Sequence, residues 1–252
     1  GGVMLVKLGI GWIDEMLPKG FRTNTSTLVS GPGGSGKPLI GYMFASGWLK
    51  NGGNVVFLLT STTLEYLKNT MKLLGVDLDD YYGRIFFIEL DPTVNGIEPV
   101  NDYQIRANFV KPSVWDEALS LANIYLSNSP SELGTMVVGA ALNLLFFSPT
   151  YGKAIHERIK GVLSADKTKT YFFTVNTDVF RDMVEELERV ADNLMFSRME
   201  KPMKLFLRVE RIKGAPFEKK EVEVPLSREI LEEIRKEAER GKKNLIPAIK
   251  RL

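Results

Sequence analysis

A run of glycines that ends in a lysine is the part of the sequence best suited to chemistry. In the pattern G-x-x-x-x-G-K-[ST], glycines allow unusual backbone angles and successive N–H groups point at phosphate oxygens. The lysine and the N-terminus of a following helix add positive charge. The first seven positions are filled here by Gly31, Pro32, Gly33, Gly34, Ser35, Gly36 and Lys37. The spacing therefore predicts a phosphate-binding loop.

The eighth position of the pattern is Pro38, where a hydroxyl normally binds Mg²⁺. Proline has neither a hydroxyl nor a backbone N–H, although its fixed φ angle suits the first turn of a helix. The loop can thus keep its shape while it loses a metal ligand and a donor. Three interpretations stay open: weak, metal-poor nucleotide binding, a loop that keeps only the turn, and, ranked after these two, tight binding of a magnesium nucleotide. Residues 31–38 are the candidate nucleotide-binding site, and we assign no catalytic residue and no metal ligand.

Apolar segments of two kinds surround this loop. Thr27–Ser30 predicts a strand before it, and the helical spacing of apolar residues from Leu39 predicts a helix after it. The alternation continues, with strands expected at 54–59, 84–90, 135–138 and 170–175 and helices at 63–74, 113–126, 150–163 and 178–189. This order predicts an α/β fold with a RecA-like, mostly parallel sheet and helices on both faces.

The last third of the chain has a different pattern. Strands with a period of two, expected at 193–198, 203–211 and 219–224, predict antiparallel edge strands near the C-terminus. Ser227 is expected to cap a charged helix that reaches Arg240 and stops at Gly241, before a basic tail. We therefore divide the chain into a P-loop domain, residues 4–226, and a charged C-terminal helix with a basic tail, residues 227–252.

Two further expectations concern the surface. Residues 91–112 are rich in Pro, Asn and Gly without a clear period, which predicts a long surface loop. In the C-terminal helix, Ile230, Leu231 and Ile234 form only a narrow apolar stripe, so this helix is expected to serve docking or assembly and not to be deeply buried.

Composition limits the function classes. The 252 residues are 44% hydrophobic and 25% charged, as in an ordinary globular α/β protein. The chain has no cysteine, which excludes disulfides, zinc-thiolate sites and thiol nucleophiles. No apolar run reaches the roughly 18 residues of a membrane span, and we expect a cytoplasmic protein without membrane contact. Residues 1–3, before Met4, are interpreted as a remnant of tag cleavage. Abundant Lys, Arg and Glu fit a thermophilic source.

Several segments resemble the KaiC-like branch of the RecA superfamily, which includes many small archaeal proteins. Leu8–Leu17 is similar to the family's T-G-I-x-x-L-D-x-x-L segment, and Val55–Leu59 to its second strand. Val190–Met195 resembles its A-D-x-hydrophobic strand, and Arg211–Gly214 its K-x-R-G turn. The similarity covers nearly all of residues 8–226. It implies a RecA-like fold and ATP or ADP as the ligand.

The resemblance also identifies positions at which this chain departs from the family. Two adjacent glutamates follow the family's second strand, where this chain has Ser61 and Thr62. An aspartate that supports Mg²⁺ ends the family's fourth strand, where this chain has Gly139. A hydroxyl is not a general base near neutral pH, and phosphoryl transfer depends on such groups. Hydrolysis by the usual mechanism is therefore not expected, ATP or ADP binding is expected to be weak, and a role for magnesium stays open.

Four charged residues complete the candidates. Arg211 and Lys213 lie where the family has a basic pair that reaches the γ-phosphate of a neighbouring subunit, which implies intersubunit phosphate sensors; solvated strand-end charges are the alternative. Glu89 and Asp91 follow or end an apolar strand and are interpreted as surface or loop carboxylates, not as a displaced metal site.

Three functions remain open on the sequence alone. The first is a hydrolysis-deficient homologue with a regulatory or assembly role, in a homo-oligomeric ring or beside an active paralogue. The second is an unconventional ATPase in which Glu89, Asp91 or a partner's residues supply the missing groups. The third, a DNA-binding accessory of the recombinase type, ranks last because the tail is only modestly basic and the net charge is +2.

Overall fold

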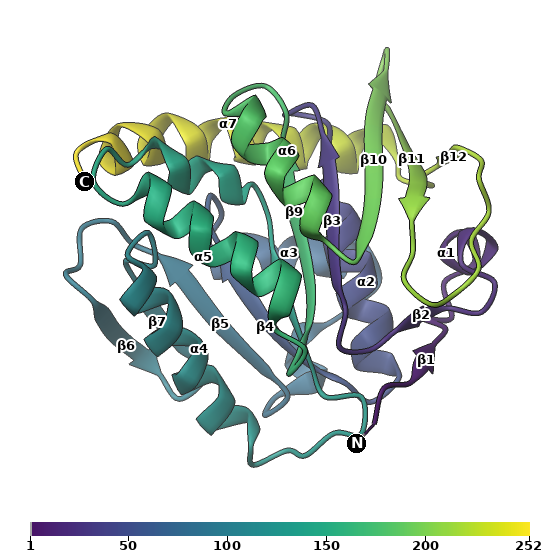
Figure 1. Cartoon of the computed structure of the whole chain (residues 1–252), viewed down its shortest axis with the longest axis horizontal. Helices are drawn as coiled ribbons and strands as arrows, with labels where there is room; N and C mark the ends of the chain where they lie inside the picture. Colours follow the sequence, from purple (N-terminus) through teal and green to yellow (C-terminus); the bar gives the residue numbers. More distant parts are fainter. Residues whose placement is uncertain (1) are drawn as a thin grey trace.

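The computed structural model describes residues 2–252, and Gly1 lies outside them. Its centre is a 10-stranded sheet whose middle strands are parallel and whose two edges carry antiparallel pairs (Figure 1). In spatial order the strands are β12 (Val222–Glu223), β11 (Lys204–Arg211), β10 (Asn193–Glu200), β3 (Ser26–Gly31), β9 (Thr170–Asn176), β8 (Thr135–Gly139), β4 (Asn54–Leu59), β5 (Ile85–Leu90), β7 (Gln104–Ala107) and β6 (Ile97–Asn101). The predicted α/β class with a mostly parallel sheet is confirmed.

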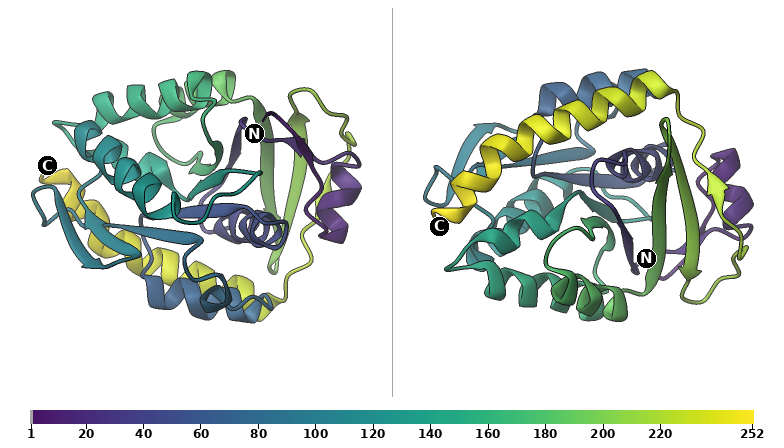
Figure 2. Two further views of the ribbon diagram at one scale, coloured as in Figure 1. Left: turned by 90° about the horizontal axis from the view of Figure 1, so that it is seen from below. Right: turned by 90° about the horizontal axis from the view of Figure 1, so that it is seen from above.

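Helices cover both faces of this sheet (Figure 2), so every residue of the central strands β3, β4 and β9 is buried. One face packs against α2 (Pro38–Lys50) and α3 (Leu64–Leu73) in an apolar cluster that includes Trp48 and Phe57. The other face packs against α4 (Pro112–Leu126), α5 (Gly152–Ala165) and α6 (Arg181–Val190) in a cluster around Trp115 and Phe173. None of the helices in residues 2–252 combines the length and hydrophobicity of a membrane span.

Short elements complete the chain. They are β1 (Leu5–Val6) and β2 (Phe21–Arg22), which pair in a second small sheet, α1 (Gly11–Met16), and the 3-10 helices η1 (Leu78–Tyr81) and η2 (Leu142–Phe147). The sequence pattern did not predict these pieces, because each is too short to establish a period.

The expectation of a long irregular loop at residues 91–112 is wrong. The segment contains β6 and β7, a hairpin that pairs along β5 and extends the sheet. The strand pattern is hidden because β6 is almost entirely exposed and contains Pro99, around which its pairing with β7 is irregular. An exposed edge strand needs no apolar alternation, and proline is tolerated there.

The C-terminal helix also differs from expectation. Ser227 caps α7 (Arg228–Lys250) as predicted, but the helix does not stop at Gly241 and continues through Pro247. An ideal Cβ on Gly241 would lie 2.0 Å from the carbonyl oxygen of Ser61. This glycine therefore permits a close approach between α7 and the end of β4, and does not terminate the helix.

The apolar stripe of α7 is buried, which corrects the expectation that it stays near the surface. Leu231 and Ile234 join the apolar cluster on the α2 face, whereas Leu245 and Ile249 join the cluster on the α5 face. The helix thus crosses the carboxyl ends of the parallel strands from one face to the other (Figures 1 and 2). At its end, the carbonyl oxygen of Leu252 accepts hydrogen bonds from the rest of the domain.

Candidate functional site

The glycine loop lies at the carboxyl end of β3, which runs directly into it. Gly34 and Gly36 have φ angles of +69° and +86°, which side-chain-bearing residues rarely adopt, and Pro38 is the first residue of α2. The sequence therefore folds as predicted here: glycines make the turn, and the proline starts the helix without disturbing it.

Lys37, the residue expected to neutralise phosphate, is folded inward. Its side chain is 2% exposed, and its Nζ donates to the carbonyl oxygen of Pro32 at 2.6 Å and to Oδ1 of Asn176 at 2.8 Å. Burial, together with the nearby charge of Lys242, lowers the pKa of Lys37 to about 7. Near neutral pH the Lys37 side chain is therefore only partly protonated, and two of its N–H groups already donate to the protein.

An acidic side chain occupies part of the loop as well. Asp178, in the segment after β9, accepts a hydrogen bond from the backbone N–H of Gly33 at 2.8 Å. Successive N–H groups of such loops are the donors that phosphate oxygens use. A carboxylate oxygen of the chain itself therefore stands where an anionic ligand would bind.

Helix α7 closes the loop from the solvent side. An ideal Cβ on Gly36 would lie 2.7 Å from Cδ2 of Leu231, and one on Gly34 would lie 3.7 Å from Nε of Arg235. The cavity that remains between the loop and α7 is about 30 Å³. The candidate phosphate site is therefore formed by the loop but covered by a second element.

The ends of β4 and β8, two strands near the loop, carry no carboxylate. Ser61 and Thr62 lie just after β4, separated from it by Thr60, and Gly139 is the last residue of β8, as predicted. An ideal Cβ on Gly139 would lie 3.3 Å from both Leu142 and Phe173, so the position is walled by apolar side chains. Within residues 2–252 no cluster of three or more His, Cys, Asp or Glu is placed to hold a metal ion. The residues present do not fit a magnesium site.

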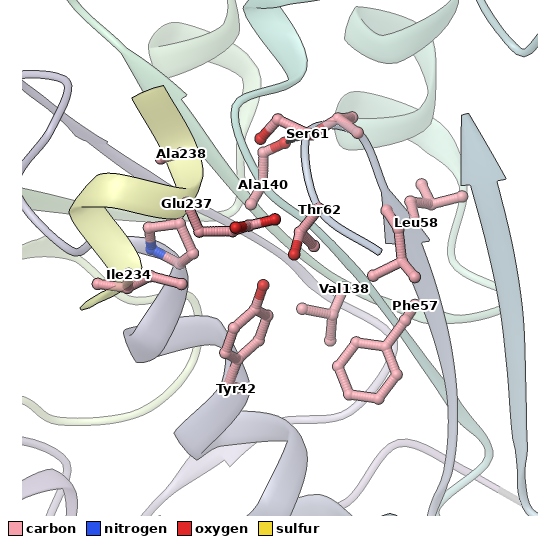
Figure 3. A pocket seen from close by; sticks show the side chains of 13 residues that line it. Tyr42, Phe57, Leu58, Ser61, Thr62, Val138, Ala140, Ile234, Glu237 and Ala238 are labelled. Atoms are coloured by element: carbon pink, nitrogen blue, oxygen red, sulfur yellow. Dashed lines mark hydrogen bonds between the residues drawn. The ribbon is translucent and has the colours of Figure 1, made fainter. Parts of the chain in front are cut away.

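A second small cavity, about 20 Å³, lies beside the first under α7. Figure 3 shows the carboxylate of Glu237, from α7, directed toward the hydroxyl groups of Thr62 and Tyr42. Glu237 Oε2 and Thr62 Oγ1 are buried and have no hydrogen-bond partner in the described chain; Nη2 of Arg240 lies 3.3 Å from Glu237 Oε2 without hydrogen-bond geometry. The burial also raises the pKa of Tyr42. Helix α7 thus places a carboxylate beside the positions that lack one.

The other acidic candidates have structural partners. Glu89 lies in β5, as predicted, where Oε2 accepts a hydrogen bond from Nε2 of Gln104 at 3.0 Å. Asp91 Oδ1 accepts hydrogen bonds from the backbone N–H and the hydroxyl of Thr93 in a tight turn. None of these hydrogen-bond partners belongs to the glycine loop.

Arg211 and Lys213 lie at the end of the strands opposite to the loop. Arg211 pairs with the start of β10, at the amino end of the parallel strands, and its Nη2 donates to two backbone carbonyls at the end of α6 at 2.7 Å each. Lys213 Nζ lies 3.5 Å from Oδ1 of Asp192 and its side chain is 54% exposed. Within one chain these residues lie at the amino ends of the parallel strands and the glycine loop at their carboxyl ends. Contact with a neighbouring subunit remains a prediction.

Three residues of the site were not singled out from the sequence: Asn176, Asp178 and Glu237. A usable signal existed for Asn176 and Asp178, because Asn176 ends the strand beside β3, Asp178 follows it, and ligands of such sheets bind beyond the carboxyl ends of the strands. Glu237 had no signal, since it is one of several glutamates in a charged helix and only the path of α7 brings it to the site.

The fold and the glycine loop define the class: a RecA-type P-loop protein. A family model described as "ATPase: KaiC" matches residues 6–110. The crystal structure of the KaiC-like protein PH0186 from the hyperthermophilic archaeon Pyrococcus horikoshii OT3 superposes with a TM-score of 0.64 at 17% identity, over 90% of this chain and 96% of that one. A search of curated proteins finds no match. The family match thus covers the region around the glycine loop, residues 6–110, and the structural similarity extends over the fold of nearly the whole chain.

Proposed function

We propose that this KaiC-like protein does not hydrolyse ATP, binds ATP or ADP weakly, and has a regulatory or assembly role. One observation carries the proposal: Pro38, the Ser61–Thr62 pair and Gly139 lie together at the carboxyl ends of neighbouring strands, and none offers a carboxylate. Phosphoryl transfer is accelerated mainly by positioning and by charge neutralisation, so losing these groups together removes most of the means of catalysis.

The backbone of residues 31–37 would hold the phosphates of a nucleotide through its N–H groups and the α2 N-terminus, and the Lys37 ammonium would contribute once it turns outward. Asp178 and the partial protonation of Lys37 both act against anion binding. Weak affinity follows from these two features.

Magnesium should add little to that affinity. A bound Mg²⁺ would supply charge neutralisation between the phosphates, but Pro38 provides no hydroxyl for it and Gly139 stands in an apolar wall. The ion would be held by phosphate oxygens and water alone.

Calorimetric titration of ATP and ADP, each with magnesium and with a chelator, tests the binding part of the proposal. Weak affinity that changes little between the two conditions is expected, and Lys37→Ala should abolish the signal. Sub-micromolar ATP binding that collapses in chelator would contradict the proposal. A phosphate-release assay on the same samples tests the absence of turnover.

The proposed role in the cell is inferred from a fold that is retained without the groups needed for hydrolysis. We propose that residues 4–226 form the P-loop unit and that residues 227–252 act on it, in a cytoplasmic protein of a thermophilic archaeal source. A ring of identical chains or an active paralogue would be the partner, with Arg211 and Lys213 offered as intersubunit phosphate sensors. Co-expression with candidate paralogues, followed by mass measurement of the native complex, tests this role.

One observation favours a second candidate function, an unconventional ATPase. The buried carboxylate of Glu237 lies beside Thr62, where it could act as the missing base. However, cavities of about 20 and 30 Å³ leave no room for a triphosphate while Glu237 is in this position. Magnesium-dependent phosphate release that is lost in Glu237→Gln would favour this candidate over the first.

A further inference from the structure

The phosphate loop and α7 occupy the same space at the carboxyl edge of the sheet. Leu231 rests on Gly36, and Nζ of Lys242 lies 3.3 Å from the Cβ position of Gly33. About 30 Å³ remains between the loop and the helix, which is roughly the space of one or two water molecules. Pockets that enclose small-molecule ligands measure roughly 300–1,000 Å³. A nucleotide therefore does not fit while α7 is docked.

Charge opposes a nucleotide in the docked state as well. Glu237 brings a carboxylate into the cavity lined by Pro38, and its Oε2 is buried without a hydrogen-bond partner (Figure 3). Nη2 of the exposed Arg240 lies 3.3 Å from this oxygen, but a carboxylate in a confined site still repels phosphate oxygens more strongly than one in open water. Steric and electrostatic obstacles thus have the same source, which is α7.

Helix α7 also has features that lower the cost of leaving. Gly241 and Pro247 lie in its interior, where both residues stabilise a helix less than alanine does. Between its apolar anchors at Ile234 and Leu245 the helix is mostly charged, and Glu237 is buried at a cost. Apolar burial therefore stabilises the docked helix mainly through Leu231 and Ile234 on one side and Leu245 and Ile249 on the other.

We propose that α7 and a nucleotide compete for the phosphate loop, so that ATP or ADP binds only those molecules in which α7 has left its docked position. This inference rests on the proposed function and names the regulation of the same site. The apparent Kd is then the intrinsic Kd divided by the undocked fraction. By linkage, nucleotide raises the undocked fraction, and anything that lifts α7 strengthens nucleotide binding.

Two glycine variants separate docking from helix stability. Gly241→Ala favours the helix itself but places a Cβ 2.0 Å from the carbonyl oxygen of Ser61, so it disfavours only the docked state. Gly161→Ala is the matched control, because Gly161 lies in α5 with open space around its Cβ position. Titration of ATP in chelator should give a Kd at least ten-fold lower for Gly241→Ala than for the wild type, and an unchanged Kd for Gly161→Ala.

Hydrogen exchange of the amides of α7 supplies the second measurement. In the wild type, saturating ATP should speed exchange across residues 228–250, and Gly241→Ala should show fast exchange without ATP. Unchanged protection of α7 at saturating ATP would overturn the competition. So would an undocked Gly241→Ala that binds ATP no more tightly than the wild type, or a Gly241→Ala whose α7 stays fully protected. Phosphate release from any of these samples would contradict the proposed lack of hydrolysis and leave the competition intact.

Discussion

The phosphate loop and the ends of β4 and β8 lie under the same helix, but they differ in what they retain. The loop keeps its glycine geometry, its lysine and the N-terminus of α2. The strand ends keep their backbone positions and have Ser61, Thr62 and Gly139 where the KaiC-like pattern has carboxylates. The loop also joins two elements of the core, β3 and α2, which are buried almost throughout. If hydrolysis is absent as proposed, the features that persist are those that the fold itself needs.

The largest expected effect comes from uncovering both regions at once. Truncation after Leu226 removes four buried apolar side chains of α7 and should lower the free energy of unfolding by roughly 5 kcal/mol or more, an estimate from transferred area. Calorimetry would measure the fall in Tm.

Point variants test the same contact. Ile249→Ala, at a fully buried position, should lower the free energy of unfolding by about 2–5 kcal/mol, while Ile124→Ala, at a position that is 66% exposed, should change it little. A truncated chain as stable as the wild type would mean that α7 is not docked in solution.

The next largest effect concerns how the free energy of unfolding depends on pH, which differs between a buried and a solvated Lys37. The pKa of Lys37 is 10.5 in the unfolded chain and is lowered to about 7 in the folded state. At pH values between these two, Lys37 therefore takes up a proton when the protein unfolds. The free energy of unfolding should therefore rise with pH from 7 to about 10, and the penalty is complete below pH 7. Relative to Lys37→Met, the wild type should gain about 3–5 kcal/mol over this window.

Denaturant titrations at several pH values measure this difference between the two proteins. Lys7→Met, at an exposed position, is the control. A stability difference between the wild type and Lys37→Met that does not change with pH would show that Lys37 is solvated and charged, and the loop would then be open.

A smaller effect is expected at the loop's own acid. Asp178→Asn removes the negative charge beside Gly33 while an amide oxygen can still accept the hydrogen bond. Affinity for ATP should rise about three- to ten-fold, at most about 1.4 kcal/mol. Titration calorimetry measures it, with Asp182→Asn on the exposed side of α6 as the control. Equal affinities of the two variants would mean that the carboxylate does not compete with phosphate.

No effect on turnover is expected from repairing the loop alone. Pro38→Thr restores the hydroxyl of the motif, but Ser61, Thr62 and Gly139 still leave water and metal without support. Phosphate release should stay at background. Robust magnesium-dependent release, abolished by Lys37→Ala in the same variant, would show that the strand ends are not deficient and would remove the contrast between the two regions.

The sequence was sufficient for features encoded locally. Strand β4 and the turn into α2 follow from apolar runs and glycine spacing, and both occur where expected. Residues 91–112 were misassigned because β6 is an exposed edge strand with Pro99, which carries no periodic signal. Gly241 is a sound local stop signal, but contact with Ser61 overrides it. The position of α7 over the loop depends on contacts between residues some 200 positions apart, which no local pattern encodes.

The two edges of the sheet have a consequence for how copies of this chain can meet. At one edge β12 is only two residues long, and at the other β6 contains Pro99, which has no N–H to offer, within an irregular pairing. Long, regular, unpaired strands are templates for fibrils and for sheets shared between molecules, whereas short or proline-bearing edges resist both. We therefore expect concentrated solutions to resist amyloid-like aggregation, and any oligomer to be joined through side chains and not by a sheet that continues from one molecule to the next.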